Sequence, residues 1–73
     1  MEELSPRQKE ILAYIIDYRQ RKDISPTFRE IAEGAGLSLG SARAHIQALR
    51  GKGYIAWDDR AARSIHIIKQ AVR

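Results

Sequence analysis

The side chains that could do chemistry in this chain are long hydrogen-bond donors gathered in residues 38–52. Arg43, Gln47 and Arg50 follow one another at helical spacing, and no acidic residue occurs in this segment. Arginine can donate two hydrogen bonds to guanine, and glutamine can pair in a similar way with adenine. We therefore expect Arg43 and Gln47 to read base edges in a DNA major groove, and Arg50 and Lys52 to contact phosphate.

No other group of residues points to catalysis or to a metal. The chain has no cysteine, and its two histidines, His45 and His66, fall in no metal-ligand spacing and beside no nucleophile–base pattern. Its 73 residues have room for one core, and a chain of this size buries only about 60% of the surface exposed by its unfolded form. Because a deep catalytic pocket would compete with that core, we expect no enzymatic activity, no metal and no cofactor.

Composition describes an ordinary globular domain, with 44% hydrophobic and 30% charged residues. No apolar run approaches the roughly 18 residues of a membrane span, and the acidic start at Glu2 and Glu3 is unlike a signal peptide. We expect a soluble, cytoplasmic protein with a single domain over residues 1–73.

Charge is divided unevenly along the chain, whose net charge is +4. Residues 1–33 carry six basic and seven acidic side chains, whereas residues 34–73 carry seven basic side chains against Asp58 and Asp59 alone. A basic half of this kind is typical of a face that binds a polyanion, most often nucleic acid. A solvated charged surface would have the same composition, so charge alone leaves both interpretations open.

Capping signals predict three helices. Ser5 with Gln8, and Thr27 with Glu30, have the spacing of a reciprocal capping box, and Ser38 offers a third N-terminal cap. Glycines and prolines separate these starts, and two β-type runs follow the third helix. The predicted elements are helices over residues 6–21, 28–35 and 39–52 and a β-hairpin over residues 54–68.

The connection between the second and third predicted helices is only about three residues long. It contains Gly36 and the apolar Leu37, a combination typical of a helix-turn-helix. With the hairpin after it, the order predicts a mainly α fold with a small β-hairpin, a winged helix-turn-helix domain.

Helical periodicity divides the third predicted helix into two faces. Ala42, Ile46 and Leu49 fall on one side and should face the core. The opposite side and its flanks hold small residues and long donors. These are Gly40, Ser41, Arg43, Ala44, Gln47, Ala48, Arg50 and Gly51.

Further DNA contacts are expected from two other places. Arg60 and Arg63 should project from the hairpin tip as a wing, along the backbone or into the minor groove. Thr27 and Arg29, at the start of the second helix, could contact phosphate, although Thr27 as a helix cap explains that residue equally well. The neighbouring aspartates either restrict how much of the tip approaches DNA or cap the turn through Asx-type bonds.

Three ring-bearing residues receive structural interpretations. We expect His45 to be half-buried at the edge of the core stripe, and His66 to point outward because it alternates with isoleucines. Trp57 is expected to pack beneath the hairpin and not to serve as a platform for stacked bases.

The chain resembles the N-terminal domain of LexA repressors over about residues 4–69. The most specific match is the segment from Pro26 to Ala32, and the start of the chain and the Lys-Gly junction before Tyr54 agree with it. The resemblance implies a winged helix-turn-helix that binds palindromic operators as a dimer and represses transcription in the SOS response of a bacterium or phage. The full predicted DNA-contacting set is Thr27, Arg29, Ser38, Ser41, Arg43, Ala44, Gln47, Arg50, Lys52, Arg60 and Arg63.

Two departures from the LexA pattern limit what the resemblance implies. The segment from Gly36 to His45 is one residue shorter than in typical LexA proteins, and its residues differ from the usual base-contacting ones. By position Ser41, Arg43 and Ala44 correspond best to the base-reading residues, but the operator sequence does not carry over. The peptidase domain of LexA does not follow in this sequence, so we expect no self-cleavage. The chain would then be either an excised domain or a standalone regulator.

A protein-interaction winged helix is the alternative function. Its third helix would dock on a partner protein, and the basic face would serve solubility. The outward face has no large apolar anchor, which argues against this alternative.

Overall fold

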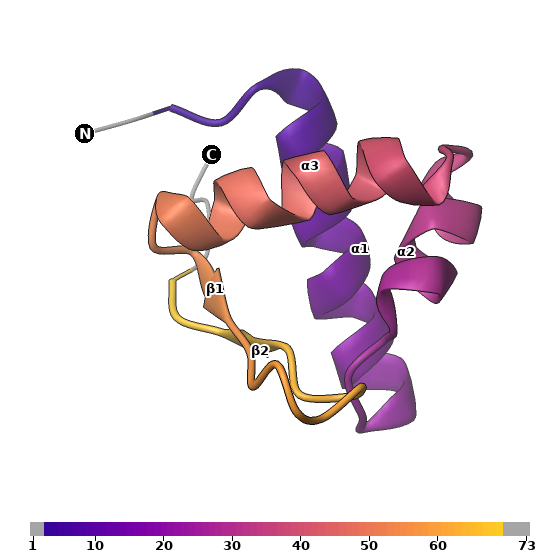
Figure 1. The fold of residues 1–73 in the computed structure, drawn as a ribbon. Helices are drawn as coiled ribbons and strands as arrows, with labels where there is room; N and C mark the ends of the chain where they lie inside the picture. The colour runs from indigo at the N-terminus through magenta and orange to yellow at the C-terminus, as the bar shows by residue number, and fades with distance from the viewer. Residues whose placement is uncertain (1–2, 70–73) are drawn as a thin grey trace.

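The computed structural model describes residues 3–69 of the chain; residues 1–2 and 70–73 of the predicted domain lie outside the described part. Three helices precede an antiparallel hairpin, which confirms the predicted fold class (Figure 1). Helix α1 ends one residue later than predicted, and α3 ends one residue earlier. The elements are α1 Pro6–Lys22, α2 Phe28–Ala35, α3 Leu39–Gly51, β1 Ile55–Ala56 and β2 His66–Ile67.

The predicted caps start all three helices. In α1 the Ser5 hydroxyl accepts a hydrogen bond from the backbone N–H of Gln8, and the Gln8 side chain accepts one from the Ser5 N–H. Thr27 and Glu30 exchange the same pair of bonds at α2. Ser38 caps α3 by accepting from the Ser41 N–H at 3.2 Å. Each cap satisfies backbone donors that have no partner inside the helix.

The turn between α2 and α3 is as tight as the sequence indicates. Gly36 ends α2 in the left-handed conformation, with φ of 69°, which residues with a side chain rarely adopt. The next residue, Leu37, donates its N–H back to the Ala32 carbonyl at 2.9 Å. The chain thereby passes from α2 to α3 through three residues, the last of which is the capping Ser38.

The core lies where the three helices meet the base of the hairpin. Helix α1 contributes Ile11, Leu12 and Ile15, all at most 1% exposed. The other helices and the hairpin close the same cluster from the remaining sides (Figure 1). Their buried members are Ile31, Ala32, Ala42, Ile46, Leu49, Tyr54, Ile55 and Ile65. Within residues 3–69 no helix combines the length and apolar character needed to cross a membrane.

The hairpin pairs over a shorter stretch than the predicted 54–68. Within residues 3–69 the register pairs are Ile55 with Ile67 and Ala56 with His66. The reason lies in the turn, where Asp58 and Ser64 bond to each other twice: the Asp58 N–H donates to the Ser64 hydroxyl, which donates to the Asp58 carbonyl. These side-chain bonds replace the strand ladder.

Buried and half-buried polar bonds fasten the hairpin to the helices. The hydroxyl of Ser25, 1% exposed, accepts from the Ile65 N–H and donates to the Pro26 carbonyl. Arg19 of α1 donates to the Ile65 carbonyl at 2.6 Å. The hairpin therefore runs from the end of α3 back to the connector between α1 and α2 (Figure 1).

Candidate nucleic-acid interface

Helix α3 presents the face that its periodicity predicts. Ala42, Ile46 and Leu49 are fully buried. The residues on the other side are exposed, including Arg43 and Gln47, the two candidate base readers, whereas Ala48 on one flank is half-buried. Also exposed are Gly40, Ser41, Ala44, Arg50 and Gly51, together with the capping residue Ser38. The prediction that α3 anchors one side in the core and leaves an acid-free side to solvent is confirmed.

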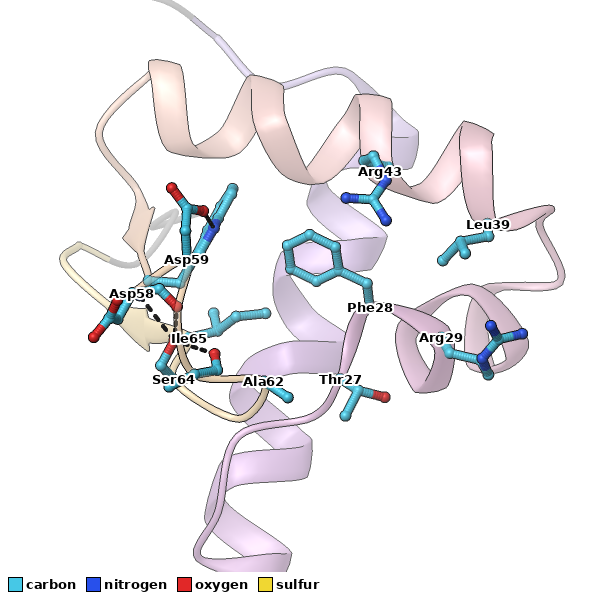
Figure 2. A pocket seen from close by; sticks show the side chains of 12 residues that line it. Thr27, Phe28, Arg29, Leu39, Arg43, Asp58, Asp59, Ala62, Ser64 and Ile65 are labelled. Atoms are coloured by element: carbon cyan, nitrogen blue, oxygen red, sulfur yellow. Dashed lines mark hydrogen bonds between the residues drawn. The ribbon is translucent and has the colours of Figure 1, made fainter.

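An open groove of about 340 Å3 lies between α3, the start of α2 and the hairpin turn. Arg43 and Leu39 border it from α3, while Phe28 and Arg29 border it from α2 (Figure 2). The hairpin contributes Trp57, Asp58, Asp59, Ala61, Ala62, Ser64 and Ile65. Helix α3 and the hairpin are therefore separated by a groove whose lining includes the aromatic residues Phe28 and Trp57.

Arg43 reaches from α3 toward the ring of Phe28 (Figure 2). Its guanidinium carbon lies 5.2 Å from the ring centroid, a distance at which a cation is attracted by the ring face. Among the ion pairs of residues 3–69, none includes Arg43. The charge is thus held in place without being neutralised by a carboxylate.

Arg50, two turns further along α3, has a different environment. Its guanidinium lies 4.2 Å from the ring centroid of Trp57, and one of its nitrogens lies 3.7 Å from an oxygen of Asp59. The same carboxylate accepts the Trp57 indole N–H at 2.7 Å. Arg50 is exposed, but part of its charge is balanced by Asp59. The expectation that Trp57 packs within the fold is also confirmed, since it is half-buried against the core.

Arg63 does not project from the hairpin tip as predicted. Its guanidinium turns back to α2 and donates to both oxygens of Glu30, at 3.0 and 2.8 Å. It also donates to the Ser25 carbonyl at 2.9 Å. The hydrogen bond from Arg63, aided by the Thr27 backbone N–H, lowers the pKa of Glu30 to about 2, and Glu30 in turn raises the pKa of Arg63. Sequence reasoning could not find this pairing, because Glu30 and Arg63 are distant in the chain.

Lys52 also has partners within the protein. Its ammonium donates to the Glu3 carbonyl at 2.8 Å and to the Gln8 side chain at 2.9 Å. Gln8 is the residue that closes the cap of α1. Lys52 therefore links the end of α3 to the start of α1, a role that nothing in its local sequence indicates.

The remaining predicted contacts stay at the surface. Arg29 and Arg60 are exposed, and neither takes part in an ion pair within the described residues. Thr27 is half-buried and its hydroxyl caps α2. Asp58 caps the hairpin turn by accepting the Arg60 N–H at 2.9 Å, which confirms the Asx-type bond for Asp58.

The histidines lie as predicted: His45 is half-buried and His66 is exposed.

Comparison with known proteins decides the family. The model of the LexA DNA binding domain matches residues 1–64. The chain belongs to this family. The match spans the helix-turn-helix and reaches Ser64 of the hairpin, so the LexA-type domain includes every residue of the groove except Ile65.

Full-length relatives are LexA repressors from several bacteria. The chain is 40% identical over 70 residues to the LexA repressor of Thermosipho africanus, covering 96% of this chain and 35% of the relative. It is 44% identical over 69 residues to that of Shouchella clausii, covering 93% and 33%. For Staphylococcus epidermidis the identity is 41% over 71 residues, covering 96% and 34%. The chain thus spans about a third of the length of these LexA repressors.

Proposed function

We propose that this LexA-type domain binds double-stranded DNA in a sequence-specific manner and represses transcription, with α3 in the major groove and the hairpin as wing. The supporting observation is the outward face of α3, which is exposed, free of acidic residues and narrow enough at Gly40 and Ala44 for close approach. Arg43 and Gln47 are the base readers. Ser41 and Ala44 lie beside them and complete the recognition surface.

The residues that we assign to phosphate differ from those predicted from the sequence. Arg29, Arg50 and Arg60 are the cations that we assign to phosphate, and the hydroxyls and amides at Thr27 and Ser38 can add neutral contacts at the two helix starts. Arg63 and Lys52 hold the fold together through the bonds described above, so we assign them no direct contact with DNA.

Two copies on a palindromic operator would provide the useful affinity. A single domain has one recognition helix, and the symmetry of a dimeric reader is matched by the symmetry of its site. We propose that the chain occupies each half-site as one copy and that repression follows from occupancy of both.

Selection of bound duplexes from a random pool is the direct test. We expect an enriched palindrome whose half-site changes when Arg43 is replaced by alanine. Binding of one domain to a half-site should weaken with salt, with a slope of about −3 in log–log form if roughly three phosphates are neutralised. A pool that shows no enrichment, with equal binding to every duplex, would contradict the proposal.

The protein-interaction alternative finds little support on the surface. The exposed large hydrophobic residues within the described part of the chain are Ile24 and Ile68, and neither belongs to α3. A docking helix would need an apolar anchor at its centre.

A further inference from the structure

Two aromatic residues form a wall between the recognition helix and the wing. Phe28 is the first residue of α2, and Trp57 directly follows β1. Their ring centroids lie 5.2 Å apart at an interplanar angle of 87°, an edge-to-face arrangement. Both rings are half-buried and pack against the core. The pair is therefore held by the fold and still offers ring surface to the groove.

Each ring of this aromatic wall, formed by Phe28 and Trp57, contacts one arginine of α3. Arg43 lies over Phe28 and Arg50 over Trp57, at 5.2 and 4.2 Å from the ring centroids. The two arginines are seven residues apart, two helical turns, so they extend from the same side of α3. Arg50 also has Asp59 as a partner, whereas the Phe28 ring is the contact that the described residues provide for the guanidinium of Arg43.

An arginine stacked on an aromatic ring loses less rotamer freedom on binding than a freely moving one. A long side chain gives up rotamer freedom when it is fixed against a base, and this loss subtracts from affinity. Stacking on an aromatic face restricts the guanidinium beforehand and leaves its N–H groups, which lie in the guanidinium plane, available for hydrogen bonds. An arginine positioned in this way can distinguish guanine from other bases at a lower entropic cost.

We infer that Phe28 is a specificity-determining residue that positions the Arg43 guanidinium for base reading, with Trp57 holding the Phe28 ring in place. The inference rests on the proposed function and adds to it a residue outside the recognition helix. Phe28 touches no base in this scheme. It acts through Arg43, so its effect should vanish when Arg43 is absent.

The stack itself can be tested in the free protein. Nuclear magnetic resonance should show the side-chain protons of Arg43 shifted upfield by the Phe28 ring, and the shift should disappear in Phe28→Leu and persist in Phe28→Tyr. Leucine keeps an apolar side chain in the wall, whereas tyrosine keeps the ring face. Random-coil chemical shifts for Arg43 in the wild-type domain would overturn the inference without any reference to DNA.

The effect on recognition is measured with a double-mutant cycle on the duplex selected by the wild-type domain. Phe28→Leu should lower affinity for that duplex roughly two- to fivefold, the range expected for an exposed cation–aromatic contact, and leave affinity for a scrambled duplex unchanged. Phe28→Tyr should restore wild-type affinity. In the Arg43→Ala background Phe28→Leu should cause no further loss.

Other outcomes of the cycle decide against the inference. Equal losses on selected and scrambled duplexes, or a loss that persists in the Arg43→Ala background, would assign Phe28 a purely structural role. Circular dichroism and thermal unfolding of each variant check folding, and Phe28→Met replaces Phe28→Leu if the latter does not fold. A wild-type domain without any sequence preference would overturn the proposed function and this inference together, whereas a specific domain with an uncoupled Phe28 overturns the inference alone.

Discussion

The guanidinium of Arg63 and the carboxylate of Glu30 meet in a two-point ion pair that fastens the hairpin to the start of α2, with N–O distances of 3.0 and 2.8 Å. Glu30 simultaneously closes the capping box of α2 by accepting the Thr27 N–H. One carboxylate thus connects the wing to the helix-turn-helix and stabilises the first turn of α2. This connection adds to the bonds of Ile65 with Ser25 and Arg19, which also fasten the hairpin.

The ion pair predicts a specific dependence of stability on pH. The pKa of Glu30 is lowered from 4.5 to about 2, so the folded state prefers the ionised carboxylate. Its contribution to the free energy of unfolding should be complete above pH 4.5 and be lost as the pH falls toward 2. The measurement is urea unfolding of wild type and Glu30→Gln between pH 2 and 6. Glutamine retains the capping box, so the stability difference should report the charge and shrink with acidification. A difference that stays constant with pH would contradict the assignment.

Replacement of Arg43 and of Arg60 should have different effects on DNA binding. Arg43→Ala should cost about 1–3 kcal/mol on the selected duplex and relax the preference at one base pair, because a bidentate base contact is lost. Arg60→Ala should weaken binding to all duplexes alike and reduce the magnitude of the salt slope by about 1, because one phosphate contact is lost. Gel-shift titrations on selected and scrambled duplexes at several salt concentrations distinguish them. Equal loss on both duplexes for Arg43→Ala would remove Arg43 from base reading.

Removal of the Asp59 charge should strengthen DNA binding. Asp59 lies 3.7 Å from Arg50 and would oppose an approaching phosphate. In Asp59→Asn the new amide oxygen can still accept the Trp57 indole N–H, so the wall should stay intact. We expect affinity for any duplex to rise about two- to fivefold at low salt, the range given by exposed ion pairs, and the gain to fade at high salt.

Asp58→Asn is the matched control for this experiment. It removes the same charge one residue away, and asparagine can still cap the turn at Arg60. Because no ion pair of the described residues includes Asp58, its replacement should change affinity less than that of Asp59. Equal gains would attribute the effect to net charge and not to release of Arg50.

Gly40 should lower the stability of α3 and at the same time allow close approach to DNA. A Cβ at this position meets no atom within 4 Å, so Gly40→Ala should raise the free energy of unfolding by up to about 1 kcal/mol through helix propensity. The added methyl group lies on the face that we propose enters the DNA major groove, and we expect specific affinity to fall. Gly51→Ala also points into open space, at the far end of α3, and should stabilise without the same loss. Thermal unfolding and duplex titration of both variants give the comparison; unchanged affinity for Gly40→Ala would place the duplex farther from this end of α3.

Replacement of Lys52 should affect the fold more than the binding of DNA. Lys52→Met keeps the apolar stem but removes the bonds to the Glu3 carbonyl and the Gln8 side chain. We expect a lower unfolding temperature and an unchanged salt slope. A salt slope reduced in magnitude by about 1 would instead restore Lys52 to the phosphate contacts.

The local features of this protein follow from its sequence because they depend on neighbours in the chain. Capping residues such as Ser5 and Thr27 satisfy donors three residues away, so their positions alone predict helix starts. Gly36 predicts the turn because few other residues tolerate its φ. The period of Ala42, Ile46 and Leu49 determines which side of α3 is buried and hence which side Arg43 and Gln47 occupy.

The tertiary structure alone decides which cationic side chains remain without a partner inside the described part of the protein. Arg63 and Lys52 look like DNA-contacting residues by type and position, but Glu30 and Gln8, distant in sequence, occupy them. The partner of a long charged side chain is set by the packing of whole elements, and local spacing contains no information about it. The same holds for the Phe28 ring beneath Arg43. The exposed, acid-free side of α3 can therefore be found from the sequence, whereas which surrounding cations are bound within the protein depends on contacts that only folding creates.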